Sequence, residues 1–434
     1  MLHRDWRHGA FVLGALGAAL LISTSPASAA DPPEDAPDAE GVEPSAGAAA
    51  AANAARIEAL ELTILRLQAA QEDAPEESSE VELKAYSGGQ RALQALNPEI
   101  SAVSDFFARY IHSETGKDYI GGERSGGFLR VMGLHLQANL DPFSFTKITA
   151  AFSPTGAAIG EAYVTWTSVF PGVSLTAGRF RQQLGVVNRW HKHGLDQFDH
   201  PPMITVPFGG GGLTQTGVSL HATLPPVWSD GLELTLEVTN GSNEAAFSGA
   251  FFSVPSGLLR LQNYWDLSDD TYLELGLTGM LGANNQRGLV GGSGEVIDEA
   301  LRGTYIGGLD LTVNWEPLER SKYHHFTWRS ELLYLVKELE DDTQLTWMGA
   351  YSYVEYKLDR SWLVGLRGDA TQPLAVDNSG QWDFGATPYI TWWQSPWVRL
   401  HLEYQARFAD GGDIDHRVIL QLVAAVGPHK HERY

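Results

Sequence analysis

The residues of this chain with the most potential for chemistry lie in one stretch, between Ser174 and Gly212. Its histidines and carboxylates are ligand types that a borderline metal such as zinc accepts: His191, His193, Asp196, Asp199 and His200. Histidines two residues apart in a flexible segment are nevertheless more often unligated, because the spacing alone does not fix their geometry. The sequence therefore permits a zinc site that includes His191, His193 and His200, but it does not require one, and no other cofactor is expected.

The same stretch concentrates charges of both signs. It carries Arg179, Arg181, Arg189, Lys192, Asp196 and Asp199, and it ends in Pro201, Pro202 and the four glycines at 209–212. In a loop that folds into a channel, such charges create a local field that filters solutes by charge and size. In an external loop they would only be solvated. The sequence leaves both interpretations open.

Local motifs of the common enzymes are missing. The chain has no GxSxG, HExxH or GxxxxGK motif, and it has no cysteine for a thiolate zinc site, a nucleophile or a disulfide. We therefore expect no enzymatic activity. A barrel hydrolase that assembles serine, histidine and aspartate from different strands needs no local motif, so that alternative stays open.

From Asn97 to the C-terminus, apolar and polar residues alternate in about sixteen segments of about ten residues. In residues 397–408, for example, Val398, Leu400 and Leu402 alternate with polar residues. This pattern predicts an all-β fold, a transmembrane antiparallel β-barrel with apolar side chains toward lipid and an aqueous lumen. The residues expected to line that lumen are Arg399, Glu403, Arg407, Glu233, Glu237 and Asp310.

Two features favour this barrel over a soluble β-sandwich. The connections expected at one end of the strands are long, at 111–126, 181–212, 239–255 and 282–302, whereas those at the other end are tight. Barrels with an external and a periplasmic side show this sorting, although the connection after Ser153 is short where a long one is expected. Tryptophans also gather near strand ends, at interfacial depth: Trp228, Trp265, Trp315, Trp362, Trp382, Trp392, Trp393 and Trp397.

The residues before the barrel divide into four segments. Residues 1–30 are typical of a secretory signal peptide, and 31–51 form an acidic tether rich in alanine and proline. Residues 52–72 predict a short helix whose seam consists of Ile57, Leu60, Ile64 and Leu67, and 73–96 form a linker to the barrel at 97–434. The helix is either a periplasmic coiled coil that helps barrels assemble, with a trimer favoured, or a single amphipathic helix against the protein.

The charge balance restricts the partners. The chain has 30 Lys and Arg against 53 Asp and Glu, a formal net charge of -23. This charge disfavours nucleic acid, because a polyanion would be repelled. The expected partners are therefore outer-membrane lipid, small solutes or ions, and further copies of the chain.

Three motifs suggest a family. They are NPEISAVSDFFARY from Asn97, the TAGRF…LGVVN…HKHGLDQFDHP region, and the closing GPHKHERY. Together they resemble, over roughly 97–434, the outer-membrane barrels labelled zinc-regulated TonB-dependent receptor-like, which are related to phosphate-selective porins. The resemblance implies an outer-membrane barrel linked to metal supply. A TonB-dependent transporter has about 22 strands and a plug domain, which the residues before Asn97 are too few to form, so the porin relatives fit better.

The leading hypothesis from sequence is a passive channel for small hydrophilic solutes or ions in the outer membrane of a Gram-negative bacterium, with the N-terminal helix in the periplasm and a possible role in zinc uptake. Mixed charges on the expected inner faces do not support the anion selectivity that phosphate-selective porins imply. The alternative is a closed or plugged barrel that binds a ligand or tethers the envelope.

Overall fold

The computed structural model describes residues 98–113, 124–243, 245–247, 254–284, 301–339, 343–408 and 414–427. The predicted signal peptide, tether, helix and linker, and the closing motif at 428–434, lie outside the described residues. None of the helices within the described ranges has the length and apolar character needed to cross a membrane.

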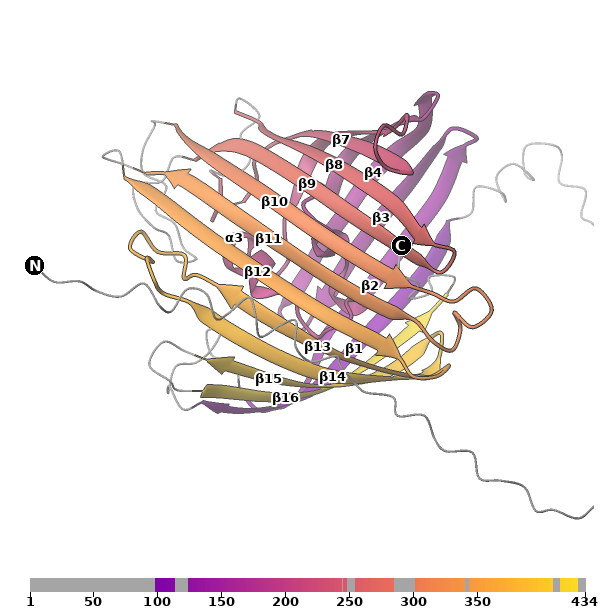
Figure 1. Ribbon diagram of the computed structural model, residues 1–434, viewed down its shortest axis with the longest axis vertical. Helices are drawn as coiled ribbons and strands as arrows, with labels where there is room; N and C mark the ends of the chain where they lie inside the picture. Colours follow the sequence, from indigo (N-terminus) through magenta and orange to yellow (C-terminus); the bar gives the residue numbers. More distant parts are fainter. Residues whose placement is uncertain are drawn as a thin grey trace, which may run out of the picture. The chain divides into compact units, whose positions relative to one another are not determined.

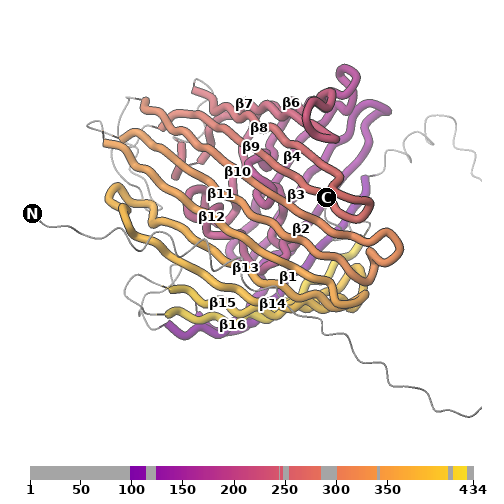
Figure 2. The backbone as a smooth tube through the Cα atoms, viewed as in Figure 1, coloured from indigo at the N-terminus to yellow at the C-terminus, as the bar shows by residue number. Residues whose placement is uncertain are grey.

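The described chain forms one closed antiparallel sheet of sixteen strands, which confirms the predicted fold class (Figure 1). The strands are β1 (Glu99–Ser113), β2 (Gly126–Asp141), β3 (Ser144–Ser153), β4 (Gly156–Phe170), β5 (Val173–Arg181), β6 (Thr214–Leu224), β7 (Gly231–Thr239), β8 (Ser256–Ser268), β9 (Thr271–Asn284), β10 (Arg302–Trp315), β11 (Phe326–Glu338), β12 (Gln344–Lys357), β13 (Trp362–Thr371), β14 (Asp383–Ser395), β15 (Val398–Phe408) and β16 (Ile414–Val426). Each strand pairs with its neighbours in sequence, and β1 pairs with β16 to close the barrel (Figure 2).

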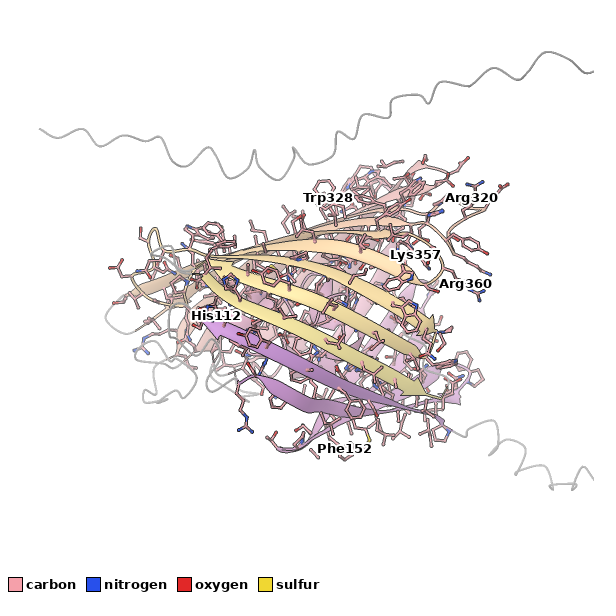
Figure 3. The ribbon with its side chains drawn as sticks, turned by 90° about the horizontal axis from the view of Figure 1, so that it is seen from below. His112, Phe152, Arg320, Trp328, Lys357 and Arg360 are labelled. Carbon is pink, nitrogen blue, oxygen red and sulfur yellow. The ribbon has the colours of Figure 1, made fainter. Side chains whose placement is uncertain are left out.

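The two faces of the wall have opposite polarity. Leu402 on β15 and its register partner Leu420 on β16 are 45% and 48% exposed on the outside. The adjacent residues Glu403 and Gln421 are fully buried on the inside. Figure 3 shows Phe152 and Trp328 on the outer side of the wall, where both are exposed. Because a soluble barrel would bury its apolar face and expose its polar one, this arrangement is that of a membrane-spanning barrel.

The strand connections are sorted as predicted, with exceptions. Long connections follow β1, β5, β7 and β9 at one end of the barrel, and tight turns follow β2, β4, β8 and β14 at the other. At the end of the barrel that carries the long connections, the β3–β4 turn is short, as the sequence indicated, and so are the connections after β11 and β15. At the opposite end, where most turns are tight, the connection between β10 and β11, residues 316–325, is long.

The tryptophans mark one rim of the barrel more than the other. Trp315 ends β10, Trp362 begins β13, and Trp392 lies near the end of β14, with the Trp362 and Trp392 rings 6.2 Å apart. All the tryptophans predicted at strand ends lie at this short-turn rim except Trp382, which precedes β14 at the other rim. An aromatic belt of this kind is expected at a membrane interface.

The lipid-facing assignment of the outer face can be tested with one charge. We expect Leu402→Arg, in the middle of β15 between Ile390 and Leu420, to lower the free energy of unfolding by about 2–4 kcal/mol, because it places a cation near the bilayer midplane. Val426→Arg, at the end of β16, should cost only about 0–1 kcal/mol. Denaturant unfolding in lipid vesicles measures both. Equal costs for the two variants would contradict the assignment.

Candidate functional site

The connection between β5 and β6, residues 182–213, folds into the barrel, and we call it the inner loop. It contains the short helices η1 (Val187–Arg189), η2 (Lys192–Gly194) and α3 (Pro202–Phe208). Its side chains Leu184, Met203 and Leu213 are fully buried, and Figure 1 shows α3 enclosed by the wall. The question that the sequence left open, whether this loop lies outside or inside, is thereby answered by its contacts.

Carboxylates of the wall accept hydrogen bonds from the backbone of the inner loop. Glu331 on β11 accepts from the amides of Val186 and Val187, at 3.1 and 3.0 Å. Glu403 on β15 accepts from the amide of Phe198 at 2.9 Å. Because a buried amide without a partner costs about 1–3 kcal/mol, these carboxylates hold the loop at two separate places in the lumen.

Arginines of the wall complement them by donating to carbonyls of the inner loop. Arg399 on β15 donates to the carbonyl oxygens of His193 and Leu195, at 3.0 and 2.9 Å. Arg367 on β13 donates to the carbonyl of Asp199 at 3.0 Å. Such charge-assisted hydrogen bonds are stronger than neutral ones. The segment 193–199 is therefore fixed against the β13–β15 side of the wall.

Asn188 ties the two ends of the inner loop together. Its side-chain amide donates to the carbonyls of Gln182 and Leu213, at 2.9 and 3.0 Å, and its oxygen accepts from the amide of Leu213 at 2.7 Å. Arg181, at the end of β5, donates to the carbonyl of Asn188 at 3.1 Å. These contacts connect the loop to the strands that precede and follow it.

An apolar contact completes the attachment. Met203 and Ile204 of α3 belong to a buried cluster that also includes Trp347 on β12. Trp347 is fully buried, and its indole N–H donates to the carbonyl of Gln372 at 2.7 Å. Trp347 lies near the start of β12, on the inner face, where it packs against α3 instead of facing the membrane interface.

Polar groups of the wall form chains of contacts toward the inner loop. The guanidinium of Arg329 lies 4.6 Å from the ring centroid of Trp190 and donates to the Tyr353 hydroxyl at 2.7 Å. The Tyr353 hydroxyl in turn donates to Asp196 at 2.6 Å. Cations and carboxylates thus meet on the surface of the loop, which is the mixture of charges that a solute-filtering constriction needs.

A further ion pair is built into the wall itself. Arg260 on β8 forms a two-point contact with Asp310 on β10, at 2.6 and 2.8 Å, across the intervening strand β9. Gly276 on β9 leaves the room for it, because an added Cβ would lie 2.4 Å from the Asp310 carboxylate. Asp310, predicted to line the lumen, therefore faces inward with its charge compensated.

The histidines of the inner loop meet a third histidine from the wall. The rings of His191 and His193 are parallel at 5.5 Å, and His135 on β2 lies edge-on to both, at 5.2 and 5.1 Å. His191 is also hydrogen-bonded to Glu161 on β4 at 2.8 Å. His200 lies elsewhere, with its ring donating to the carbonyl of Trp190 at 3.1 Å. Across the described ranges, no three metal-ligand side chains are arranged to hold a metal ion.

The predicted pore-lining residues fall into three places. Those on the inner face of the wall are Arg399, Glu403, Arg407, Glu233, Glu237 and Asp310. Those on the inner loop are Arg189, Lys192, Asp196 and Asp199, and Arg181 contacts the loop from the end of β5. The prediction that Arg179 lines the pore is wrong. Ala177 on β5 pairs with Val218, which is exposed on the outer face, and Arg179 lies two residues further along the same strand and therefore shares that outer face.

Several inner-face residues that hold the loop were not predicted. Glu331, Tyr353 and Arg367 contact the inner loop as closely as the predicted Arg399 and Glu403 do. They occupy alternate positions of β11, β12 and β13, so the period-2 pattern could have placed them on the polar face. Nothing in the sequence indicates which inner-face residues meet the loop.

Comparison with known proteins places the fold. No family model matches the chain. A protein of Aquifex aeolicus (strain VF5), whose description names no function, is 28% identical over 321 residues, 66% of this chain and 67% of that protein.

Solved structures similar to this chain are outer-membrane barrels. The match to OprB of Pseudomonas putida covers 78% of this chain and 97% of the OprB chain, with 10% identity and a TM-score of 0.52. The match to the outer membrane channel DcaP of Acinetobacter baumannii covers 76% of this chain and 97% of the DcaP chain, with 12% identity and a TM-score of 0.51. The match to the anion-selective porin from Comamonas acidovorans covers 76% of this chain and 99% of the porin chain, with 11% identity and a TM-score of 0.50. The shared feature is the fold, and the zinc-regulated TonB-dependent receptor label finds no support among them.

The attachment of the inner loop to Glu331 depends on Gly185. Gly185 has φ +63°, and an added Cβ would lie 2.0 Å from the Glu331 carboxylate. We expect Gly185→Ala to lower the free energy of unfolding by about 1–3 kcal/mol, from backbone strain and the displaced carboxylate. Gly194→Ala is the matched control in the same loop, because a Cβ there meets no atom within 4 Å. Denaturant unfolding in detergent micelles should separate the two, and equal stabilities would contradict this account of the loop.

Burial of His200 predicts a pH dependence. Burial lowers the pKa of His200 well below its ordinary value, and nearby Arg181 and Lys192 add to the effect. Below a pH of about 6.5 the unfolded chain binds a proton at His200 that the folded chain does not, so acid should reduce the free energy of unfolding, by up to about 1.4 kcal/mol per pH unit. Unfolding measured between pH 5 and 7 should show a shallower slope for His200→Gln. An unchanged slope would contradict the prediction.

Proposed function

We propose that this protein is a passive outer-membrane channel for small hydrophilic solutes or ions, with the inner loop as its constriction. The observation that carries the proposal is the inner loop itself, which crosses the lumen and is hydrogen-bonded to Glu331, Arg367, Arg399 and Glu403 of the wall. A barrel of this strand number encloses an aqueous lumen. A loop fixed inside that lumen sets the size and charge of what passes.

The charges at the constriction support hydrophilic cargo. Arg329 and Asp196 both meet the Tyr353 hydroxyl, and Arg130 contacts Asp199 at 3.4 Å. Oriented charges of both signs favour solutes that carry their own polar groups and disfavour apolar ones. The printed names of the similar barrels, an outer membrane channel and an anion-selective porin, are in keeping with such a role.

The outer surface of the barrel supports a location in the outer membrane. An exposed apolar belt with an aromatic rim suits the outer membrane of a Gram-negative bacterium, with the short-turn rim and the predicted N-terminal helix in the periplasm. We propose a homo-oligomer, with a trimer favoured, which chemical cross-linking of the full-length protein in detergent would test.

Channel activity is tested in planar bilayers. We expect discrete, salt-dependent conductance steps from the wild-type protein. Glu331→Gln should increase the step size or its noise, because Val186 and Val187 donate to different oxygens of Glu331 and glutamine replaces one of these oxygens by an NH2 group, so that the inner loop loosens. Glu233→Gln is the matched control, since Glu233 is an inner-face carboxylate of β7 whose contacts with Tyr264 and His221 are both to the wall.

The outcomes separate the leading function from its alternative. A folded, purified barrel that stays electrically silent in both wild-type and Glu331→Gln forms would contradict the channel. It would favour the closed barrel, which binds a ligand or tethers the envelope. Ester or phospholipid hydrolysis by the purified protein would instead reveal a barrel hydrolase.

Zinc is a second, separately testable ligand of the constriction. The grounds for it are the neighbouring rings of His191 and His193, a pair of imidazoles that could ligate zinc together with water. If zinc binds there, it should shift the reversal potential under a salt gradient in the wild-type protein. It should not do so in the His191→Ala, His193→Ala double variant. A shift of equal size in both proteins would remove zinc from this loop.

A further inference from the structure

A second histidine cluster lies outside the lumen, at the seam where the barrel closes. His112 is near the end of β1 and His416 is near the start of β16, and the two are register partners across the seam. Their rings are nearly parallel, with centroids 6.0 Å apart and 19° between planes. Tyr404 on β15 lies on the other side of His416, 6.0 Å away, with its hydroxyl 2.6 Å from His416 Nδ1.

This cluster is on the outer face of the wall. Tyr110 and Val418, the next register pair on the same face, are 61% and 41% exposed. His112 itself is exposed, and Figure 3 shows it at the end of its strand. This is the rim of the long connections. A small ion in the surrounding water can therefore reach both rings.

We propose that His112 and His416 form a binding site for a late first-row divalent cation, of the Cu²⁺, Ni²⁺ or Zn²⁺ type. Imidazole nitrogen is a ligand that these ions prefer. Side chains directly opposite on antiparallel strands have Cβ atoms about 4.5–5.5 Å apart, and metal–nitrogen bonds of about 2.0–2.1 Å bring two imidazole centroids to about 5 Å. The observed 6.0 Å closes to that value when the two rings turn about their side-chain torsions, which also takes them out of the nearly parallel arrangement so that one nitrogen of each points at the metal.

Tyr404 orients one of the two ligands. A metal-binding histidine commonly donates its second ring N–H to an oxygen, which fixes the tautomer and the ring. The Tyr404 oxygen beside Nδ1 accepts such a hydrogen bond and leaves Nε2 of His416 for the metal. Tyr404 is therefore a positioning residue, and water supplies the remaining coordination positions. A two-histidine site is compatible with the lack of any arrangement of three or more protein ligands in the described ranges.

Because the site lies between β1 and β16, a bound metal ion should stabilise the closed barrel. The metal would bridge the first strand to the last, at a level where the Ser113 hydroxyl already donates to Asp415 at 2.6 Å on the inner side. Because the two histidines meet only in the folded barrel, an ion that binds both of them stabilises the folded state by mass action. Binding should therefore raise the unfolding temperature of the barrel as well as occupy its rim.

The test is Cu²⁺ titration of purified, untagged, full-length protein in detergent, followed by electron paramagnetic resonance. We expect two imidazole nitrogens per copper at the first equivalent in the wild-type protein, and no more than one in His112→Ala or His416→Ala. Tyr404→Phe should keep both nitrogens and weaken binding about 10-fold. His324→Ala, which changes a histidine in the β10–β11 turn, is the control and should behave as wild type.

A second measurement separates this site from the inner loop. Zn²⁺ should raise the unfolding temperature of the wild-type protein and of the His191→Ala, His193→Ala variant. The rise should be smaller in the His112→Ala, His416→Ala variant, and any rise that remains there should disappear when His191→Ala and His193→Ala are added. The proposal is overturned if the His112→Ala, His416→Ala variant keeps the two-nitrogen signal, or if the inner-loop variant alone loses it. Channel conductance is not a readout here, so failure of the proposed function would leave this result unaffected.

Discussion

Every backbone amide and carbonyl of a strand in lipid must find its partner within the protein, and closure of the sheet meets this constraint. In this chain the closing pair is β1 with β16, in register from Ala102 with Val426 to Ser113 with Asp415. Once the sheet is closed, alternate side chains must face opposite solvents. The outward leucines and the inward carboxylates and guanidinium groups follow from that geometry.

A similar requirement governs the inner loop, because much of its irregular backbone belongs to residues that are buried against the wall. Its amides and carbonyls cannot pair with one another in a regular ladder, so they pair with the wall. Glu331 and Glu403 accept from its amides, and Arg367 and Arg399 donate to its carbonyls. The inward charges that the strand pattern demands are therefore also the attachment points of the constriction.

The two groups of histidines lie in different environments and are therefore suited to different roles. His135, His191 and His193 are packed inside against Glu161, where any ion must enter through the lumen. His112 and His416 lie on the outer rim, where the pairing of β1 with β16 places them opposite each other with their rings nearly parallel. The histidines inside the barrel can contact solutes that pass through the lumen. Those on the outer rim can bind the metal ion proposed above, which would link β1 to β16.

Much of this protein could be determined from the sequence by itself. The period-2 alternation depends only on neighbouring residues, and it indicated the barrel, the strand number and the inward positions of Glu237, Asp310, Arg399 and Glu403. The outer position of Arg179, the edge-on packing of His135 and the pairing of His112 with His416 could not be determined in this way. Only the tertiary structure decided them, because strand register and the path of the inner loop depend on contacts between residues far apart in the chain, which local pattern does not encode.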